Sequence, residues 1–389
     1  MTVLLALILA PFILLTLGFA VEVFVGLKPL ARAFTPAENC RAVIIVPAHD
    51  EQTILLDRLQ LLQQAAKDRA RILLVADNCS DSTAEIGRGL GVEVIERFDN
   101  ERRGKGFALD FARKDLERDP PDVIVFIDAD CMIDGPSLAT LINVCAASAR
   151  PCQATNLQKP AIDGSPAVQM STFAFFIKNV IRQRALQRLA RRVHLLGTGM
   201  ALPWLLFAKA ELATSNIVED LKLGQELAAA GHAPLLVELA TVWSDAETDR
   251  NTLSQRQRWE GGYLQNALRT GPRALARSIG RADARGVWAA MDTVIPPFAF
   301  LIFVDVAVFA IGVVLTALGG ASYWPVALLG GALSLSVVAL ALAWAAGGSR
   351  FVTFAALCRA PLYVAWKIPM YLNLARRGAP KEWQRTGRE

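Results

Sequence analysis

The chain has 389 residues, of which 53% are hydrophobic and 20% charged, and its formal net charge is +5. Soluble domains average about 45–50% apolar and about 25% charged residues, so this composition favours a membrane protein. It excludes a disordered or collagen-like chain, because charge is low and glycine has no period. Its six cysteines form no CxxC pair and it has three histidines, which argues against a zinc cluster.

The first expected element is a membrane anchor over 1–27. Residues 3–27 are apolar except for Glu22 near their end, and at about 1.5 Å per residue this stretch spans the roughly 30 Å hydrocarbon core. The flank after it carries Lys28 and Arg32, whereas the first two residues have no charged side chain. The positive-inside rule therefore predicts an N-terminus outside the cell.

The region 28–292 is expected to be a cytosolic domain in which strands and helices alternate. Short β-branched or apolar runs predict four strands, at 42–46, 72–76, 92–95 and 123–127. The segments between them have helical patterns, at 55–66, 83–89 and 106–116. This alternation predicts an α/β domain with a parallel sheet covered on both faces, whose ligands lie beyond the carboxyl ends of the strands.

Acidic residues follow three of these four strands. The clusters are His49-Asp50-Glu51, Asp77 to Asp81, and Asp128-Ala129-Asp130. Carboxylates gathered at one edge of a sheet repel one another unless a cation lies between them, and paired carboxylates suit Mg²⁺ or Mn²⁺. Each cluster taken alone could equally be a set of turn formers.

Two basic, partly apolar stretches, at 167–192 and 261–285, are interpreted as interfacial helices lying on the membrane. For the second stretch a solvated charged face is the alternative. Nucleic-acid binding is not expected in a chain that is anchored to a bilayer.

The segment 293–347 is expected to cross the membrane twice, at about 294–318 and 324–346, because no charge occurs from Val306 to Ser349 and Gly319-Gly320 marks a turn. Asp305 within the first span is either a functional group or a structural hydrogen-bonding residue. The final segment, 348–389, contains a kinked interfacial or re-entrant stretch over 351–374 and a basic cytosolic tail. The whole predicts an integral protein of the inner (plasma) membrane.

The motifs, taken together, resemble those of a membrane-bound family 2 glycosyltransferase with the nucleotide-sugar-binding GT-A fold. The similarity is to the branch that includes cellulose, hyaluronan and chitin-oligosaccharide synthases and ceramide glucosyltransferases. The motifs that carry it are Val46-Pro47-Ala48-His49-Asp50-Glu51, the Asp77 segment, Asp128-Ala129-Asp130, Glu219-Asp220, and Gln255-Arg256-Gln257-Arg258-Trp259, which matches a QxxRW pattern. His49 and Asp50 depart from the usual aromatic residue and Asn, so contacts near the base are expected to differ.

The resemblance implies a role for each matched residue. Asp220, next to Glu219, would be the catalytic base, and Asp130 with Asp128 would hold Mg²⁺ or Mn²⁺. The substrate-binding set implied by the motifs is Pro47, Glu51, Asp77, Lys105, Asp128, Gln255, Arg258 and Trp259. Within that set Asp77 would contact the base or ribose, Lys105 and Arg258 the diphosphate, and Trp259 the acceptor. Trp259 as an ordinary buried tryptophan remains an alternative, and His194 is expected to be structural.

The leading functional hypothesis is an inverting glycosyltransferase that uses a nucleotide sugar, a UDP-sugar by resemblance, and builds β-linkages in a cell-surface or extracellular polysaccharide. Its partners would be a glycan or lipid-linked acceptor, membrane lipids and polysaccharide export proteins. Two alternatives stay open. One is a single addition to a lipid or lipid-linked acceptor, and the other is an inactive scaffold of an export complex.

Overall fold

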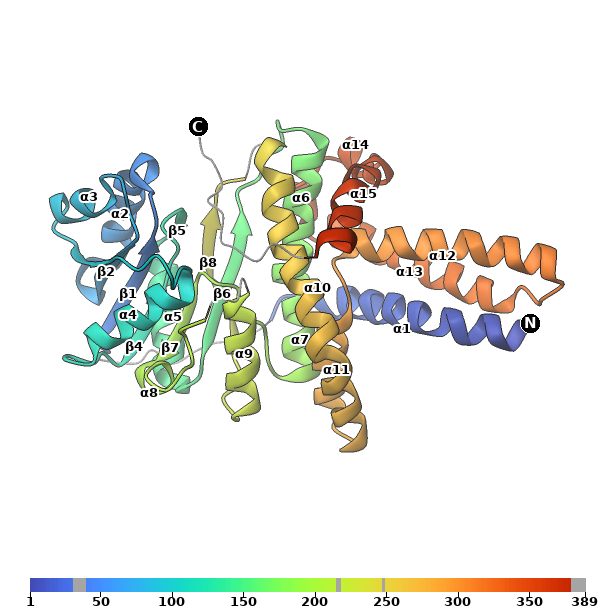
Figure 1. The fold of residues 1–389 in the computed structure, drawn as a ribbon, viewed down its shortest axis with the longest axis horizontal. Helices are drawn as coiled ribbons and strands as arrows, with labels where there is room; N and C mark the ends of the chain where they lie inside the picture. The colour runs from blue at the N-terminus through green and yellow to red at the C-terminus, as the bar shows by residue number, and fades with distance from the viewer. Residues whose placement is uncertain (31–39, 215–217, 247–248, 379–389) are drawn as a thin grey trace.

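The computed structural model describes residues 1–30, 40–214, 218–246 and 249–378, without the side chains of 249–256, 258, 375 and 377. Figure 1 shows two parts: a domain built around one sheet, and a rod of helices that projects from it.

The sheet has eight strands in the order β3-β2-β1-β4-β7-β6-β8-β5. Their bounds are β1 Ala42–Ala48, β2 Ala70–Asp77, β3 Glu93–Arg97, β4 Val123–Phe126, β5 Cys131–Ile133, β6 Cys152–Gln158, β7 Met200–Pro203 and β8 Leu235–Ser244. Strands β3, β2, β1 and β4 are parallel, as expected. The expectation of a wholly parallel sheet is wrong, because β7 runs antiparallel to β4 and β6, and β5 runs antiparallel to β8.

Helices cover both faces of the sheet, as the alternation of side chains along the strands requires. Ile44 and Val46 of β1 pack with α2 and α5, whereas Val43 and Ile45 pack with α4, α8 and α9 on the other face. The bounds of the helices in this domain are α2 Gln52–Ala66, a 3-10 turn Lys67–Arg69, α3 Thr83–Gly89, α4 Lys105–Leu116, α5 Gly135–Ser148, α8 Trp204–Phe207 and α9 Glu219–Ala229. The mixed sheet, covered by helices on both faces, agrees with the expected α/β architecture.

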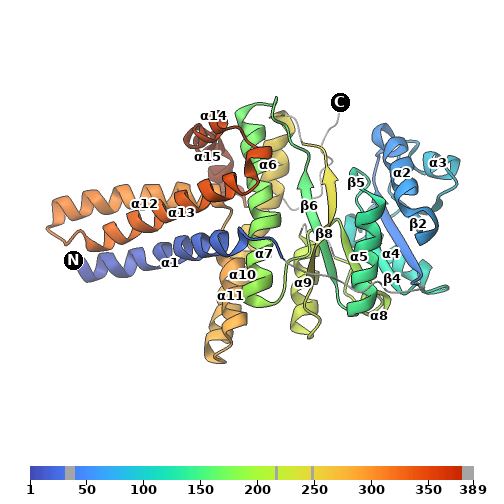
Figure 2. The ribbon, with the colours of Figure 1, turned by 180° about the vertical axis from the view of Figure 1, so that it is seen from behind.

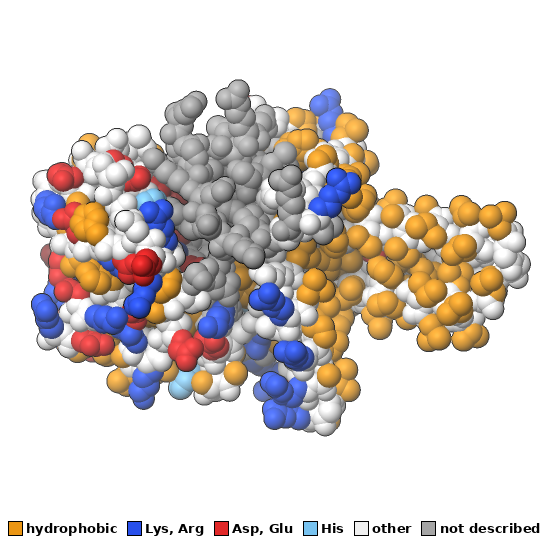
Figure 3. All heavy atoms as spheres, viewed as in Figure 1, with side chains coloured by type: hydrophobic (Ala, Val, Ile, Leu, Met, Phe, Trp, Pro, Cys, Tyr) orange, Lys and Arg blue, Asp and Glu red, His pale blue; other side chains and the backbone are white. Residues whose placement is uncertain are grey.

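The rod consists of α1 (Thr2–Gly26), α12 (Phe298–Gly319) and α13 (Trp324–Ala345), which are long and apolar enough to cross a membrane. Hydrophobic side chains cover the rod and charged ones gather on the rest of the molecule (Figure 3). Asp305 of α12 is fully buried in it and contacts the Thr16 hydroxyl at 2.5 Å. The structure thus gives Asp305 a hydrogen-bonding partner on a neighbouring helix.

A layer of helices joins the rod to the sheet domain (Figure 2). It contains α6 Pro166–Phe176, a π-helical turn Ile177–Arg182, α7 Gln183–Ala190, α10 Asp249–Gly280 and α11 Ala284–Val294. Residues 167–192 were expected to place apolar side chains in lipid, but Phe173, Ile177 and Ile181 are buried against Phe19 and Val23 of α1. Much of this stretch is therefore an internal joint, because α1 covers its apolar side.

The end of the described chain lies beside this joint. It forms a 3-10 turn Gly348–Arg350, α14 Phe354–Leu357 and α15 Ala360–Arg377. Figures 1 and 2 place α14 and α15 next to α6 rather than along the rod. Buried Lys367 of α15 is paired with Glu260 of α10.

Candidate active site

The site is built around Lys105, the first residue of α4. Its ammonium is ion-paired with Asp128, which follows β4, and donates a hydrogen bond of 2.7 Å to the carbonyl oxygen of Gly197. The backbone N–H of Asp128 donates to the Thr198 hydroxyl oxygen at 3.1 Å. Strand β4, helix α4 and the 197–199 turn thus meet at one point.

Asp220, at the start of α9, faces the same point. A Cβ atom built on Gly197 would lie 3.2 Å from an Asp220 carboxylate oxygen and 3.5 Å from the Lys105 ammonium. Gly197 also has a φ of +83°, which an L side chain rarely adopts. Glycine at this position is therefore what lets Asp220, Lys105 and Asp128 approach one another.

The electrostatics of the site are those of crowded carboxylates around one cation. Burial raises the pKa of Glu219 to about 8, with the neighbouring Asp220 adding to the effect. Burial also raises the pKa of Asp128 and of Asp220 above its usual value. For Lys105, burial acts to lower the pKa, but Asp128, Glu219 and Asp220 outweigh it, so the pKa is raised and the ammonium stays charged. A second positive charge would relieve the repulsion that remains.

Asp128 and Asp130 offer the ligands for such a charge. Their carboxylate oxygens and the Cys131 sulfur all lie within 4.8 Å of one another. Burial raises the pKa of the Cys131 thiol well above its usual value, and sulfur is a soft ligand that suits Mg²⁺ or Mn²⁺ poorly. The carboxylate oxygens that remain are hard donors and fit Mg²⁺ or Mn²⁺.

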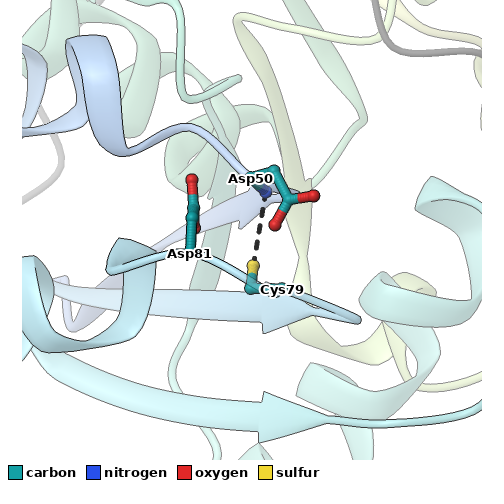
Figure 4. Close-up of side chains that lie close together, drawn as sticks. All are labelled: Asp50, Cys79 and Asp81. Atoms are coloured by element: carbon teal, nitrogen blue, oxygen red, sulfur yellow. Dashed lines mark hydrogen bonds between the residues drawn. The ribbon is translucent and has the colours of Figure 1, made fainter.

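Asp50, Cys79 and Asp81 form a second cluster, between the ends of β1 and β2 (Figure 4). Here the polar atoms are used by the protein itself. Asp50 accepts the Ser80 N–H at 2.6 Å, Asp81 accepts the Thr83 hydroxyl at 2.5 Å, and burial raises the pKa of the Cys79 thiol to about 11. These residues connect two loops beside the site.

The predicted nucleotide residues lie at the same edge of the sheet. Pro47 is in β1, and Glu51 caps the start of α2, where its N–H donates to the Thr83 hydroxyl at 2.8 Å. Asp77 ends β2 and is buried. Burial raises its pKa, while the Arg97 guanidinium, 2.7 Å away, opposes that shift. Arg97 was not predicted as a partner of Asp77. It stands at the end of β3, opposite Asp77 in the parallel register, and this position was the signal that could have identified it.

The QxxRW motif lies in α10. The side chains of Gln255 and Arg258 fall outside the described residues, so their predicted contacts with substrate remain predictions. The ring of Trp259 is 5.8 Å from that of Phe175 in α6. Trp259 thus lies at the joint between the sheet domain and the rod.

Gln153, which was not predicted, supports the 197–199 turn. The buried Gln153 side chain accepts the N–H of Leu196 at 2.8 Å and donates to the carbonyl of Thr198 at 2.9 Å. His194 is paired with Asp292 of α11, which agrees with its expected structural role. No local pattern distinguishes Gln153 from a surface glutamine.

The family model described as "Glycosyltransferase like family 2" matches residues 40–262, more than half of the chain. The chain belongs to glycosyltransferase family 2. It is therefore a glycosyltransferase, as the motifs predicted, whereas the branch of the family is a separate question. Among curated proteins, none matches this sequence.

The expected GT-A fold is confirmed by this family match and by the similarity to a solved mannosyltransferase. A mannosyltransferase, PcManGT from Pyrobaculum calidifontis in complex with GDP-Man and Mn²⁺, is 18% identical and has a TM-score of 0.56. The similarity covers 90% of this chain and 99% of that one. Glucosyl-3-phosphoglycerate synthase from Mycobacterium tuberculosis, in complex with Mn²⁺, UDP and phosphoglyceric acid, is 14% identical with a TM-score of 0.40, over 61% of this chain and 84% of that one.

Proposed function

We propose that this protein transfers a sugar from a nucleotide-sugar donor to an acceptor at the cytosolic surface of the inner membrane, with inversion at the anomeric carbon. The observation that carries the proposal is the meeting of Lys105, Asp128 and Asp220 around Gly197. Lys105 and Asp128 would face the diphosphate of the donor, and Asp220 would face the hydroxyl of the acceptor.

The proposed reaction is a single displacement. An acceptor hydroxyl oxygen attacks the anomeric carbon, the bond from that carbon to the β-phosphate oxygen breaks, and its electron pair stays on the departing nucleoside diphosphate. The hydroxyl proton passes to Asp220. A buried carboxylate with a raised pKa is better suited to this task than an exposed one, because a base works best when its pKa is near the working pH.

The diphosphate that departs carries negative charge, which Lys105 is placed to offset. Mg²⁺ or Mn²⁺ bound by Asp130 and Asp128 would supply the remaining positive charge. The fit rests on the carboxylate pair within 4.8 Å, and the complex of the mannosyltransferase with GDP-Man and Mn²⁺ supports it by analogy. Asp77 would contact the base or ribose, and Pro47, Glu51, Gln255 and Arg258 would complete the donor site.

The acceptor defines two versions of this function. In the first, the enzyme extends a cell-surface or extracellular polysaccharide in the manner of the cellulose, hyaluronan and chitin-oligosaccharide synthase branch, and export proteins are its partners. In the second it makes one addition to a lipid-linked acceptor. A scaffold that has lost chemistry is disfavoured, because Asp128, Asp130 and Asp220 are all present.

Product analysis tests the proposal directly. The full chain in lipid nanodiscs is offered UDP- and GDP-sugars with Mn²⁺ or Mg²⁺, and the products are separated by size. A ladder establishes the polymerising version, and one addition to a lipid-linked acceptor establishes the other. An absence of turnover with every donor, together with nucleotide binding that does not respond to Mn²⁺ or to Asp130→Ala, would refute the proposal.

A further inference from the structure

The last helix that the structure describes, α15, buries a lysine. Lys367 is 1% exposed, whereas lysines are almost never fully buried in proteins unless they are paired. Its ammonium pairs with one carboxylate oxygen of Glu260 in α10, and the Tyr371 hydroxyl, one turn further along α15, donates to the other at 2.8 Å. Both carboxylate oxygens of Glu260 are therefore bound by the same helix.

Aromatic rings enclose the Lys367 ammonium. It lies 5.2 Å from the centroid of the Tyr363 ring and 5.7 Å from that of the Tyr371 ring, and at such distances a cation is attracted to the face of a ring. The Tyr371 ring also packs edge-on against Phe300 of α12, with the ring centroids 4.8 Å apart. These contacts fix the ammonium in place, and they connect α10 through α15 with a membrane helix.

Glu260 stands at a sensitive place in α10. It directly follows Trp259, the last residue of the QxxRW motif. Three residues further along α10, Tyr263 is buried in one cluster with Leu221 of α9. Leu221 comes directly after the proposed base, Asp220, and its N–H donates to the Asp220 carboxylate at 2.7 Å. Helix α10 therefore packs against the segment that carries the proposed base.

We infer that Lys367 is a positioning residue for the transfer reaction, because it fixes Glu260 and thereby the place of α10. Helix α10 in turn holds Asp220 in place through the contact of Tyr263 with Leu221. The inference rests on the proposed function and deepens it. It gives a role to a helix that lies outside residues 40–262, the range that the family model matches.

This role predicts a larger effect on turnover than on donor binding. Of the residues proposed for the donor, only Gln255 and Arg258 belong to α10, and the others lie along the sheet edge or at the starts of α2 and α4. A base displaced by about 1 Å from the acceptor hydroxyl can lower the rate of transfer by roughly 10²-fold. Loss of the contact should therefore lower kcat by roughly tenfold or more and change the donor KM by a smaller factor.

The test compares stability with turnover in the full chain in lipid nanodiscs, and turnover is counted per Mn²⁺-dependent nucleotide-binding site. Lys367→Met leaves the buried Glu260 carboxylate without its cation, so both the thermal midpoint and kcat should fall. Adding Glu260→Gln removes that unpaired charge, so the midpoint should return towards that of the wild type. Turnover should stay at least about tenfold below the wild type, because the ion pair that held α10 is still missing. Recovery of turnover together with stability would overturn the inference.

Two tyrosines of α15 supply a matched comparison that leaves the charges in place. Tyr371→Phe removes the hydroxyl that binds Glu260, whereas Tyr363→Phe removes a hydroxyl without a hydrogen-bond partner among the described residues. Both variants keep the ring beside the ammonium. The first should lower kcat by roughly threefold or more, and the second should leave it unchanged. Equal turnover in the two variants would contradict the role even where the ion-pair variants fail to fold.

Hydrogen exchange at the start of α9 gives a readout that needs no substrate. Amides over 221–225 should exchange faster in Tyr371→Phe and in the double variant than in the wild type, whereas amides of β1 should not change. Unchanged exchange in α9 would overturn the proposed link from α15 to Asp220. If the wild type transfers no sugar from any donor, the proposed function fails, and the exchange experiment still decides whether α15 holds the start of α9.

Discussion

Asp292 should be among the most sensitive single positions for the stability of the joint. Its carboxylate accepts a hydrogen bond of 2.9 Å from Arg182 and is paired with His194, and it is 3% exposed. Arg182 in turn binds Glu22 at 2.7 Å. Removing one partner of such a buried set leaves an uncompensated charge, which costs about 3–5 kcal/mol in other proteins.

We expect Asp292→Asn to cost about 3 kcal/mol, at the lower end of this range, because the amide oxygen still accepts one hydrogen bond. Burial raises the pKa of Asp292, but Arg182 and His194 outweigh burial, so the pKa lies below its ordinary value of 3.8. The stabilisation is therefore fully present above that value and is lost only as the pH falls through the lower, folded-state pKa. A measurement at neutral pH records all of it.

The assay is thermal unfolding of the purified protein in one detergent, at a fixed scan rate because membrane proteins of this size unfold irreversibly. Asp292→Asn should lower the midpoint by roughly 5 °C or more. The control is Glu96→Gln, which breaks an ion pair with Arg88 whose side chains are 50% and 32% exposed and should cost less than about 1 kcal/mol. Equal shifts in the two variants would show that the joint does not depend on this charge set.

Three further predictions concern catalysis and topology. Asp220→Asn should lower transfer by roughly 10²- to 10⁴-fold and leave Mn²⁺-dependent nucleotide binding nearly intact; substantial remaining turnover would remove Asp220 as the base. Gly197→Ala should lower turnover at least about tenfold, because its Cβ would lie 3.2 Å from the Asp220 carboxylate. The control is Gly231→Ala, at a position with a similar φ of +90° and no atom within 4 Å of the added Cβ. It should cost about 1–2 kcal/mol of backbone strain and leave turnover unchanged. A cysteine at exposed Ser322, between α12 and α13, should react with an impermeant maleimide only from outside, and one at exposed Arg281 only from the cytosolic side; the reverse pattern would invert the predicted orientation.

The parallel half of the sheet could be predicted from the sequence because its signals are local. Strands such as β1 and β4 are short β-branched runs, and the residues that follow them, Asp128 and Asp130 among them, lie at one edge once the strands are parallel. The apolar lengths that form α1, α12 and α13 are equally local. Lys105 was found only through the family resemblance, and the structure then brought it to Asp128.

Strand β6 could not be predicted in this way. Four of its seven residues are Gln, Thr or Asn, and all four are at most 5% exposed. Gln153 hydrogen-bonds with the 196–199 turn and the Thr155 hydroxyl donates to the carbonyl of Glu238, and both partners lie far along the chain. Polar residues in a short segment indicate an exposed loop unless the distant partners are known, so the half of the sheet beyond β4 was missed.

The place of the stretch at 167–192 could not be read from its composition either. A basic, apolar stretch is compatible with a lipid surface and with a protein surface, since both offer apolar area and negative charge. What decided between them was Glu22, which is 160 residues from Arg182 in sequence, and Asp292, which is 110 residues away. A carboxylate near the end of an apolar span is costly unless it is paired, so Glu22 already required a cation from elsewhere in the chain, and the basic stretch at 167–192 was an available source.

The pairing has a consequence for the active site. Gly26 of α1 lies so close to the π-helical turn that an added Cβ would be 2.0 Å from the Ile181 carbonyl oxygen, so the anchor and this turn are fitted to each other. From Arg182 the contacts continue through Asp292 to His194, which stands three residues before Gly197. The turn that receives the Lys105 ammonium is therefore connected to α1 through the buried side chains of Arg182, Asp292 and His194. An anchor whose only task was to hold the enzyme at the membrane would need none of these contacts, so α1 is a structural part of the catalytic domain.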